Sequence, residues 1–310
     1  MKRILFISIG PQTDIVKSLR EVGIVWQYDW TGLTSEEFNR DVILLSEMND
    51  FDIVFMQIQH PGIITVETAK RLSEKSYVVN WTGDVRSPLP EWYKEIGGFI
   101  DLTLFSNMND LYEMWGLRLK ADYLDIGFPD EIFVPDGDRY TDHPPIVFMG
   151  QNTGNAFPLS RYRCDMVDFL TNRFGSLFRL YGHGWYGGDV RPITDQNEEA
   201  KIYRSCKVAI NLSHFDYEKY SSDRIYRIMG SGCLCLSHRY KGVEEQFKEH
   251  EYIELWRNFD ELSDLIDNAL NSPIRAMRTG SLAAHNVHIN HTWRNRVAQL
   301  MNLIRLYPKK

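Results

Sequence analysis

Residues 208–237, VAINLSHFDYEKYSSDRIYRIMGSGCLCLS, contain the clearest structural pattern in the chain. The two ends, 208–212 and 233–237, are short apolar runs, which are typical of strands buried on both faces of a sheet. Between them, 223–231 has the spacing of a helix that follows a capping residue and ends near glycine. We therefore predict a strand, a helix and a second, parallel strand joined by a right-handed crossover.

The same alternation continues on both sides of this segment. In the first half, strands are predicted at 3–9, 51–59, 77–82, 102–106 and 123–126, and helices at 14–22, 35–48 and 65–75. In the second half, strands are predicted at 146–149, 178–181, 208–212, 233–237 and 252–255, and helices at 161–172, 223–231, 260–270 and 292–306. Strands that alternate with helices indicate parallel sheets covered by helices.

A polar stretch rich in turn formers, VPDGDRYTDHPP at 134–145, separates the two series. The chain has 310 residues, a length that suits two domains. We predict an α/β protein with two Rossmann-like, doubly wound domains at 1–140 and 141–290. A C-terminal helix at 291–310 is expected to pack back across the interface. Ligands of open α/β sheets bind beyond the carboxyl ends of the strands, so the loops there are the candidate site.

The composition narrows the classes of function. A net charge of −7 and a pI near 5.7 argue against broad nucleic-acid binding. A local basic groove stays open, because five arginines lie in one stretch: Arg161, Arg163, Arg173, Arg179 and Arg191. We expect a cytoplasmic protein, because there is no apolar run of about 18 residues and the apolar N-terminus lacks a signal-peptide cleavage site.

Three loops of the second half join small residues to a strand end. After 146–149 come Gly150, Gln151 and Asn152, and a helix that contains Arg161 follows. Glycine lets a backbone approach a ligand closely, and a helix start with an arginine favours phosphate. We predict a diphosphate contact here. The alternative is a flexible surface loop with a solvated arginine.

The second loop follows the strand at 178–181 and contains Gly182 and His183. A glycine on each side of a histidine at a strand end suits a turn that faces a ligand. The alternative is a tight turn that packs Trp185 for stability.

The third loop contributes the candidate diphosphate-binding residues Ser213, Ser221, Ser222, Arg224 and Arg227. Ser222 or Asp223 is a suitable cap for the helix at 223–231. Arg224 and Arg227 are three residues apart and share a helix face, which is costly unless a negative group lies between them. A diphosphate is one candidate for that group, and Asp or Glu from elsewhere in the fold is the alternative.

These residues resemble the GT-B glycosyltransferases. YRSCKVAINLS at 203–213 resembles their second-domain strand, and SDRIYRIMGSGCLCL at 222–236 resembles their donor-binding helix and the next strand. HTWRNR at 291–296 is similar to the motif that often starts their last helix. The resemblance covers most of 145–300, and within the superfamily it is closest to CgeB-type, spore-coat-associated proteins. In the first half it rests on architecture, FDIV at 51–54 and WTGD at 81–84.

The resemblance implies a nucleotide-sugar donor, with a UDP-sugar expected. One departure is visible. Many retaining members carry two glutamates separated by seven residues, one at the donor sugar and one at the ribose hydroxyls. Lys219 and Arg227 stand at these positions. The usual ribose contact and the stereochemical outcome are therefore open, and a degenerate, non-catalytic member is an alternative.

The first half offers candidates for the acceptor side. His60 and Asp84 each follow a predicted strand, and an acceptor hydroxyl needs a base or hydrogen-bond partner as it attacks the anomeric carbon. We predict a catalytic role for Asp84 first and His60 second. The structural alternatives are that His60 orders its turn and that Asp84 pairs with Arg86. The turn at Gly10 and Pro11 is a candidate wall of the acceptor site.

The sequence thus predicts a glycosyltransferase that needs no cofactor beyond its nucleotide-sugar substrate. Arginines and N–H groups, rather than a bound metal, are expected to stabilise the departing diphosphate. The acceptor is unidentified: a glycan, a small molecule or a modified DNA base. The alternative functions are a degenerate nucleotide- or sugar-binding protein and a sugar epimerase of the same fold.

Overall fold

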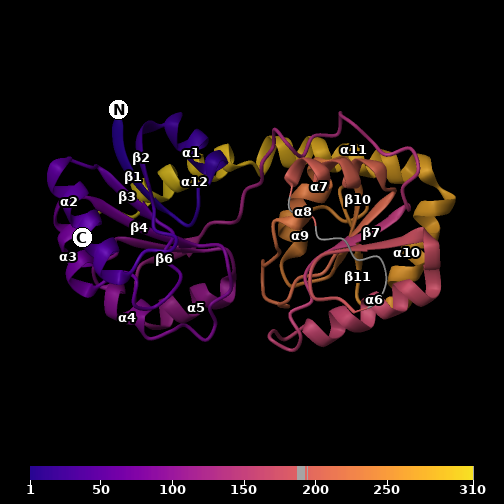
Figure 1. Ribbon diagram of the computed structural model, residues 1–310, viewed down its shortest axis with the longest axis horizontal. Coiled ribbons are helices and arrows are strands. Elements are labelled where there is room, and N and C mark those ends of the chain that lie inside the picture. The colour runs from indigo at the N-terminus through magenta and orange to yellow at the C-terminus, as the bar shows by residue number, and fades with distance from the viewer. Residues whose placement is uncertain (187–192, 194, 310) are drawn as a thin grey trace. The chain divides into compact units, whose positions relative to one another are not determined.

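The computed structural model describes residues 1–186, 193 and 195–309 (Figure 1). The chain forms two compact units. The first comprises Met1–Ile126 and Trp293–Lys310, and the second comprises Gly127–Thr292. Each unit has its own sheet, and every pairing between neighbouring strands is parallel.

The first unit contains a sheet with the strand order β2-β1-β3-β4-β5-β6. Its strands are β1 (Lys2–Ser8), β2 (Gly23–Asp29), β3 (Ile53–Met56), β4 (Tyr77–Thr82), β5 (Leu102–Phe105) and β6 (Ala121–Tyr123). Its helices are α1 (Thr13–Arg20), α2 (Ser35–Met48), α3 (Val66–Lys75), α4 (Trp92–Gly97), α5 (Met108–Gly116) and α12 (Trp293–Leu306).

The second unit contains a sheet with the strand order β11-β10-β9-β7-β8. Its strands are β7 (Ile146–Met149), β8 (Phe178–Tyr181), β9 (Val208–Asn211), β10 (Leu234–His238) and β11 (Glu254–Trp256). Its helices are α6 (Ser160–Phe174), α7 (Gln196–Ser205), α8 (Arg224–Gly230), α9 (Val243–Gln246), α10 (Phe259–Asn271) and α11 (Pro273–Asn290), with a 3-10 turn at Gly175–Leu177.

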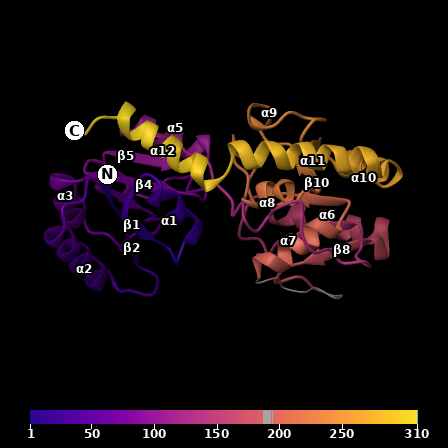
Figure 2. The ribbon, with the colours of Figure 1, turned by 90° about the horizontal axis from the view of Figure 1, so that it is seen from above.

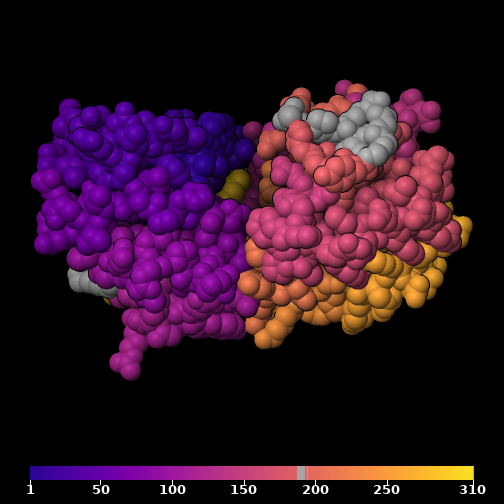
Figure 3. Space-filling model, turned by 60° about the horizontal axis from the view of Figure 1, so that its bottom comes forward, coloured from indigo at the N-terminus to yellow at the C-terminus, as the bar shows by residue number. Residues whose placement is uncertain are grey.

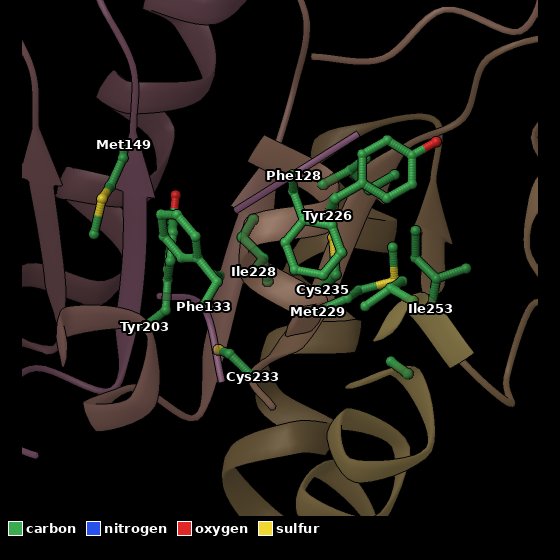
Figure 4. Packing of buried hydrophobic residues seen from close by; sticks show 14 of the residues in the cluster. Phe128, Phe133, Met149, Tyr203, Tyr226, Ile228, Met229, Cys233, Cys235 and Ile253 are labelled. Carbon is green, nitrogen blue, oxygen red and sulfur yellow. The ribbon is translucent and has the colours of Figure 1, made fainter. Parts of the chain in front are cut away.

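Both sheets are covered on both faces, because alternate residues of a strand enter different clusters. In β7, Ile146 and Phe148 pack with α6 and α10, whereas Val147 and Met149 pack with α7, α8 and α11. The second of these clusters is seen in Figure 4, where Phe133, Tyr226 and Cys235 come from separate segments of the chain. In the first unit, α1 and α12 cover one face, and α2 to α5 cover the other.

The predicted fold class, two doubly wound α/β sheets, is confirmed. The division of the chain differs from the predicted position near 140, because it falls after Ile126. Phe128 and Phe133 are fully buried in the core of the second unit, so the chain has joined that unit before the polar stretch at 134–145. At the other end, α12 packs through Val297, Leu300 and Leu303 within the first unit.

Candidate functional site

A pocket of about 210 Å³ lies in the second unit, beyond the carboxyl ends of β7 and β8. Three loops and two helices contribute to its wall. The lining residues are Met149, Gly150, Gln151, Tyr181, Gly182, His183, Ile193, Glu199, Asp223, Arg224 and Arg227. Six of the predicted donor-binding residues therefore lie together: Gly150, Gln151, Gly182, His183, Arg224 and Arg227.

The loops after β7 and β8 run side by side. The backbone N–H of Gly150 donates to the Tyr181 carbonyl at 2.9 Å, and that of Asn152 donates to the His183 carbonyl at 2.8 Å. A Cβ on Gly182, where φ is +136°, would lie 1.9 Å from the Gly150 carbonyl oxygen. The glycine is thus required by the approach of the two loops.

The loop after β8 has both of the roles that were predicted as alternatives, a turn that faces a ligand and a turn that packs Trp185. Trp185 donates its indole N–H to the Gly150 carbonyl at 2.7 Å, which is the packing role expected of a structural turn. Gly182 and His183 nevertheless line the pocket. Asn152 does not line it, and its side-chain oxygen accepts the Gly154 N–H at 3.0 Å.

Two guanidinium groups converge beside Gly150. A Cβ on this glycine would lie 2.5 Å from one terminal nitrogen of Arg163 and 3.4 Å from one of Arg224. Both groups also lie over the ring of Phe148, 5.0 and 5.4 Å from its centroid. Arg163 is only 1% exposed, whereas Arg224 lines the pocket. Two cations therefore lie against a glycine that leaves no side chain between them.

The contacts of these two arginines are to neutral oxygen atoms. Arg163 donates to the carbonyls of Leu212 and Gln151, and Arg224 donates to the Leu212 carbonyl and to the side-chain oxygen of Asn211. Neither has a carboxylate partner among the residues that the structure describes. Burial, followed by the charge of Arg224, lowers the pKa of Arg163 to about 9. An anion at Gly150 would relieve both effects.

Arg227, one helical turn further, has the opposite environment. Its guanidinium contacts Glu199 of α7 at 2.9 Å and Asp223 at 2.5 Å. Burial lowers the pKa of Arg227, but the charges of Asp223 and Glu199 raise it by more, so the net shift is upward. The sequence left open whether a diphosphate or protein carboxylates would neutralise Arg224 and Arg227. The carboxylates do so for Arg227.

Several predicted residues lie elsewhere. Arg161 is exposed and pairs with Asp165 on the same helix at 2.9 Å, so Arg163, two residues later, is the arginine that reaches the loops. The predicted cap of α8 is wrong: Asp223 at its start makes no side-chain capping bond and pairs with Arg227 instead. Arg191 lies outside the described residues.

The three serines form a hydrogen-bonded layer beneath α8. Ser213 accepts the Ser222 N–H at 3.2 Å, and Ser221 accepts a bond from Asn211 at 3.2 Å. The Ser222 hydroxyl is buried and has no partner among the described atoms. None of the three lines the pocket. Ser221, together with Ser237, holds the side-chain amide of Asn211, whose oxygen in turn accepts from Arg224.

His214 was not predicted as a site residue. Its ring packs on Phe157 at 4.8 Å between centroids, and its Nδ1 is buried without a partner in the described part of the chain. Burial, with the charges of Arg163 and Arg224, lowers the pKa of His214 to about 4. The imidazole is therefore neutral at pH 7 beside the two arginines.

Lys219, which stands where the family resemblance expects a glutamate, has left-handed backbone with φ of +54°. Its amine contacts Glu245 of α9 at 2.5 Å. Like Arg227, it is thus compensated by a carboxylate from a neighbouring element.

The predicted acceptor-side residues all belong to the first unit. Asp84 follows β4, is 68% exposed at its side chain and contacts Arg86 at 3.2 Å. His60 is exposed, with its ring 6.5 Å from that of Trp30. The N–H of Gly10 donates to Asp29 at 2.9 Å, and Gln27 donates to the Pro11 carbonyl at 2.5 Å. These hydrogen bonds fix the turn at Gly10 and Pro11. The ion pair between Asp84 and Arg86, which was predicted as the structural alternative, is present.

Neither a metal site nor a membrane helix is found in the described part of the chain. No group of three or more His, Cys, Asp or Glu side chains there is placed to hold a metal ion. No helix there is long and apolar enough to cross a membrane. Metal independence stays a prediction.

Comparison with known proteins gives matches at two levels. Residues 161–302, just under half of the chain, match the model of a family described as glycosyl transferase-like. No curated protein sequence matches.

Solved structures resemble the whole chain. HepE from Anabaena in complex with UDP and glucose has a TM-score of 0.67 at 10% identity, covering 98% of this chain and 100% of that one. Sucrose-phosphate synthase from Thermosynechococcus elongatus has a TM-score of 0.64 at 11% identity, covering 99% of each. A protein from Listeria monocytogenes that is assigned as a UDP-N-acetylglucosamine 2-epimerase has a TM-score of 0.59 at 11% identity, covering 98% of this chain and 95% of that one. The chain therefore has the GT-B fold, and residues 161–302 are similar to the glycosyl transferase-like family.

Proposed function

We propose that the protein is a glycosyltransferase that uses a nucleotide-diphosphate sugar, with UDP as the nucleotide. The observation that carries the proposal is the pair Arg163 and Arg224, which converge on Gly150 and have no carboxylate partner in the described part of the chain. The family match at 161–302 and the UDP complex of a structural neighbour support it. The sugar and the acceptor are not assigned; a glycan, a small molecule or a modified DNA base each fits the proposal.

The diphosphate is assigned to the pocket beside Gly150. Arg224 donates to it directly, and the charge of Arg163 acts from behind the loop. Negative charge develops on the phosphate as the sugar leaves, so preorganised cations stabilise the transition state more than the ground state. In the transfer, the acceptor oxygen bonds to the anomeric carbon while the bond from that carbon to the phosphate oxygen breaks. The acceptor proton passes to Asp84 in this proposal, with His60 as the second choice.

Calorimetry with UDP and uridine tests the phosphate assignment. Arg224→Ala should weaken UDP binding by about 10- to 150-fold, because a charged hydrogen bond contributes about 1.5–3 kcal/mol. Uridine binding should be unchanged. Arg161→Ala is the matched control, since this arginine is exposed and pairs with Asp165. Equal losses for UDP and uridine, or an equal loss in the control, would contradict the assignment.

A second measurement separates turnover from binding. UDP release from UDP-glucose, with and without a mixture of acceptors, is expected of a transferase. Binding without release would favour the degenerate binding protein. An epimerase is the other candidate, since one structural neighbour is assigned that activity. It would change the configuration of the sugar in an acceptor-independent way, which carbohydrate analysis of the recovered material would detect.

A further inference from the structure

Helix α11 buries small residues and exposes large apolar ones, the reverse of the usual pattern. The residues packed inward are small: Ala276, Thr279, Gly280, Ala283, Ala284 and Val287. A Cβ on Gly280 would lie 2.3 Å from the Gly232 carbonyl oxygen, so the backbone of α11 lies directly on the segment between α8 and β10. The helix lies along the outside of the second unit over these elements (Figure 2).

The large apolar residues of α11 face outward. Ile274 is 84% exposed, Met277 69%, Ile289 53% and Leu282 39%. Single exposed apolar residues are ordinary, but four on one helix form a surface that packing within the chain does not explain. Figure 3, which brings the lower side of Figure 1 forward, shows orange and yellow atoms from the C-terminal part of the second unit along its lower edge.

The charged side chains of α11 itself are all cationic, and one of them, Arg275, contacts Glu254 of β11 at 3.6 Å. The 18 residues of α11 include Arg275 and Arg278 and no Asp or Glu. The neighbouring helix α10, by contrast, carries four acidic residues. A second copy placed face to face on α11 would bring arginine against arginine. The charge pattern therefore favours an anionic partner over self-association.

A cationic pocket of about 220 Å³ adjoins the start of α11. Pro273 and Met277 form one side, and Arg139, Arg204 and Lys207 contribute to the other. None of the lining residues that the structure describes is acidic. Lys207 precedes β9 and Gly232 precedes β10, so this pocket lies at the amino ends of the strands, opposite the donor pocket.

The two arginines of this pocket contact neutral oxygen atoms. Arg204, which is 8% exposed, donates to the carbonyls of Asp138 at 3.0 Å and Val134 at 3.3 Å. Arg139 donates to the carbonyls of Arg204 at 2.6 Å and Pro135 at 3.1 Å. Burial and then the charge of Arg139 lower the pKa of Arg204, against an opposing attraction from Asp138. The cations outnumber the acid, and the pocket attracts an anion.

We propose that this pocket and the start of α11 form a docking site for an anionic phospholipid. The phosphate of the headgroup accepts hydrogen bonds from Arg139 and Lys207, while Ile274 and Met277 enter the boundary of the acyl chains. A free phosphate would satisfy the same cations. Only a lipid uses both the cations and the protruding aliphatic side chains beside them.

Co-sedimentation of the full chain with vesicles tests this proposal. Vesicles of phosphatidylcholine alone are compared with vesicles that also contain phosphatidylglycerol. Binding is expected only to the anionic vesicles and should weaken about fivefold for each cation removed, in Arg139→Gln and Lys207→Gln. The pair Ile274→Ser and Met277→Ser should also weaken it, although these residues are too exposed to affect folding.

A matched control uses exposed residues of the first unit, Met48→Ser with Lys75→Gln. Thermal melting of every variant shows that the fold is retained. Equal binding to neutral and anionic vesicles, or equal loss in the control, would overturn the proposal. So would binding of soluble glycerol phosphate by calorimetry with no sedimentation, because the pocket would then serve a free phosphate.

Discussion

The two sheets both place arginines beyond the carboxyl ends of their strands, but the charges are compensated differently. In the first unit, Arg86 contacts Asp84 and Gln59, and its backbone N–H donates to Asp110 at 2.8 Å. In the second unit, Arg163 and Arg224 contact carbonyl and amide oxygens. The first arginine is paired with a carboxylate, whereas the other two have no carboxylate partner among the residues that the structure describes.

This difference separates structural charges from those that await a ligand. A buried cation without a carboxylate partner loses its hydration, and hydrogen bonds to neutral oxygen atoms offset only part of that loss. The lowered pKa of Arg163 reflects this cost. The same contrast recurs within α8, where Arg227 has two carboxylates and Arg224 has none among the described residues. Residue type alone therefore does not identify a phosphate site; the partners of each arginine do.

The largest expected effect concerns Asp84. Its pairing with Arg86 suggests a structural role, whereas the proposed function gives it a catalytic one. If Asp84 accepts the acceptor proton, Asp84→Asn should lower the single-turnover rate by about 10²- to 10⁴-fold. The melting temperature should hardly change, because an exposed ion pair contributes about 0–1 kcal/mol. UDP affinity should also be unaffected, since the donor is assigned to the second unit.

Glu47→Gln is the control for this variant, because Glu47 forms a similarly exposed pair with Arg71 at 3.1 Å. If Asp84→Asn melts lower than the control and turns over normally per folded molecule, Asp84 is structural. His60→Gln is then the next variant to assay.

The second prediction compares Arg224 with Arg227 in the absence of ligand. Arg227→Gln leaves Glu199 buried without its cation and should destabilise the protein by about 3–5 kcal/mol. Arg224→Gln removes a repulsion from Arg163 and should leave the free energy of unfolding unchanged or raise it. Urea denaturation of the two variants measures both effects. Similar destabilisation by both substitutions would show that Arg224 is also structurally compensated.

Most of the strands could be located from the sequence because they are buried on both faces, whereas their order in each sheet was not predicted. β4, β7 and β8 have the bounds expected from their apolar runs. β2 was missed because it is an edge strand that is only partly buried, and its apolar run is limited to the three residues Ile24, Val25 and Trp26. α11 was missed because its inward residues are small and its large apolar residues face solvent, which hides the helical stripe.

The site was only partly predictable. Arg161 and Arg163 are close in sequence, but only Arg163 shares a helix face with the buried Met166, Val167 and Leu170, at spacings of three, four and seven. That signal was available and points to Arg163. Glu199 carried no such signal, because it reaches Arg227 from α7, a helix that was not predicted. Long-range partners of this kind are set by tertiary packing.

The smallest expected effect is an opposite response of the two regions to acid. Burial raises the pKa of Asp110 in the first unit to about 6, and burial with Arg163 and Arg224 lowers that of His214 in the second to about 4. Between pH 3.8 and 6 the folded state binds more protons at Asp110 than the unfolded state, so acid stabilises. Between pH 6.5 and 4 the unfolded state binds more protons at His214 than the folded state, so acid destabilises the protein.

On going from pH 7 to pH 5, each of the two residues changes the free energy of unfolding by about 1–2 kcal/mol. Urea denaturation at both pH values should therefore show Asp110→Asn to be more acid-sensitive than the parent protein and His214→Gln to be less so. If both variants shift in the same direction, the electrostatic contrast between the two strand edges is wrong, and the neutral contacts of Arg163 and Arg224 no longer mark a site that awaits an anion.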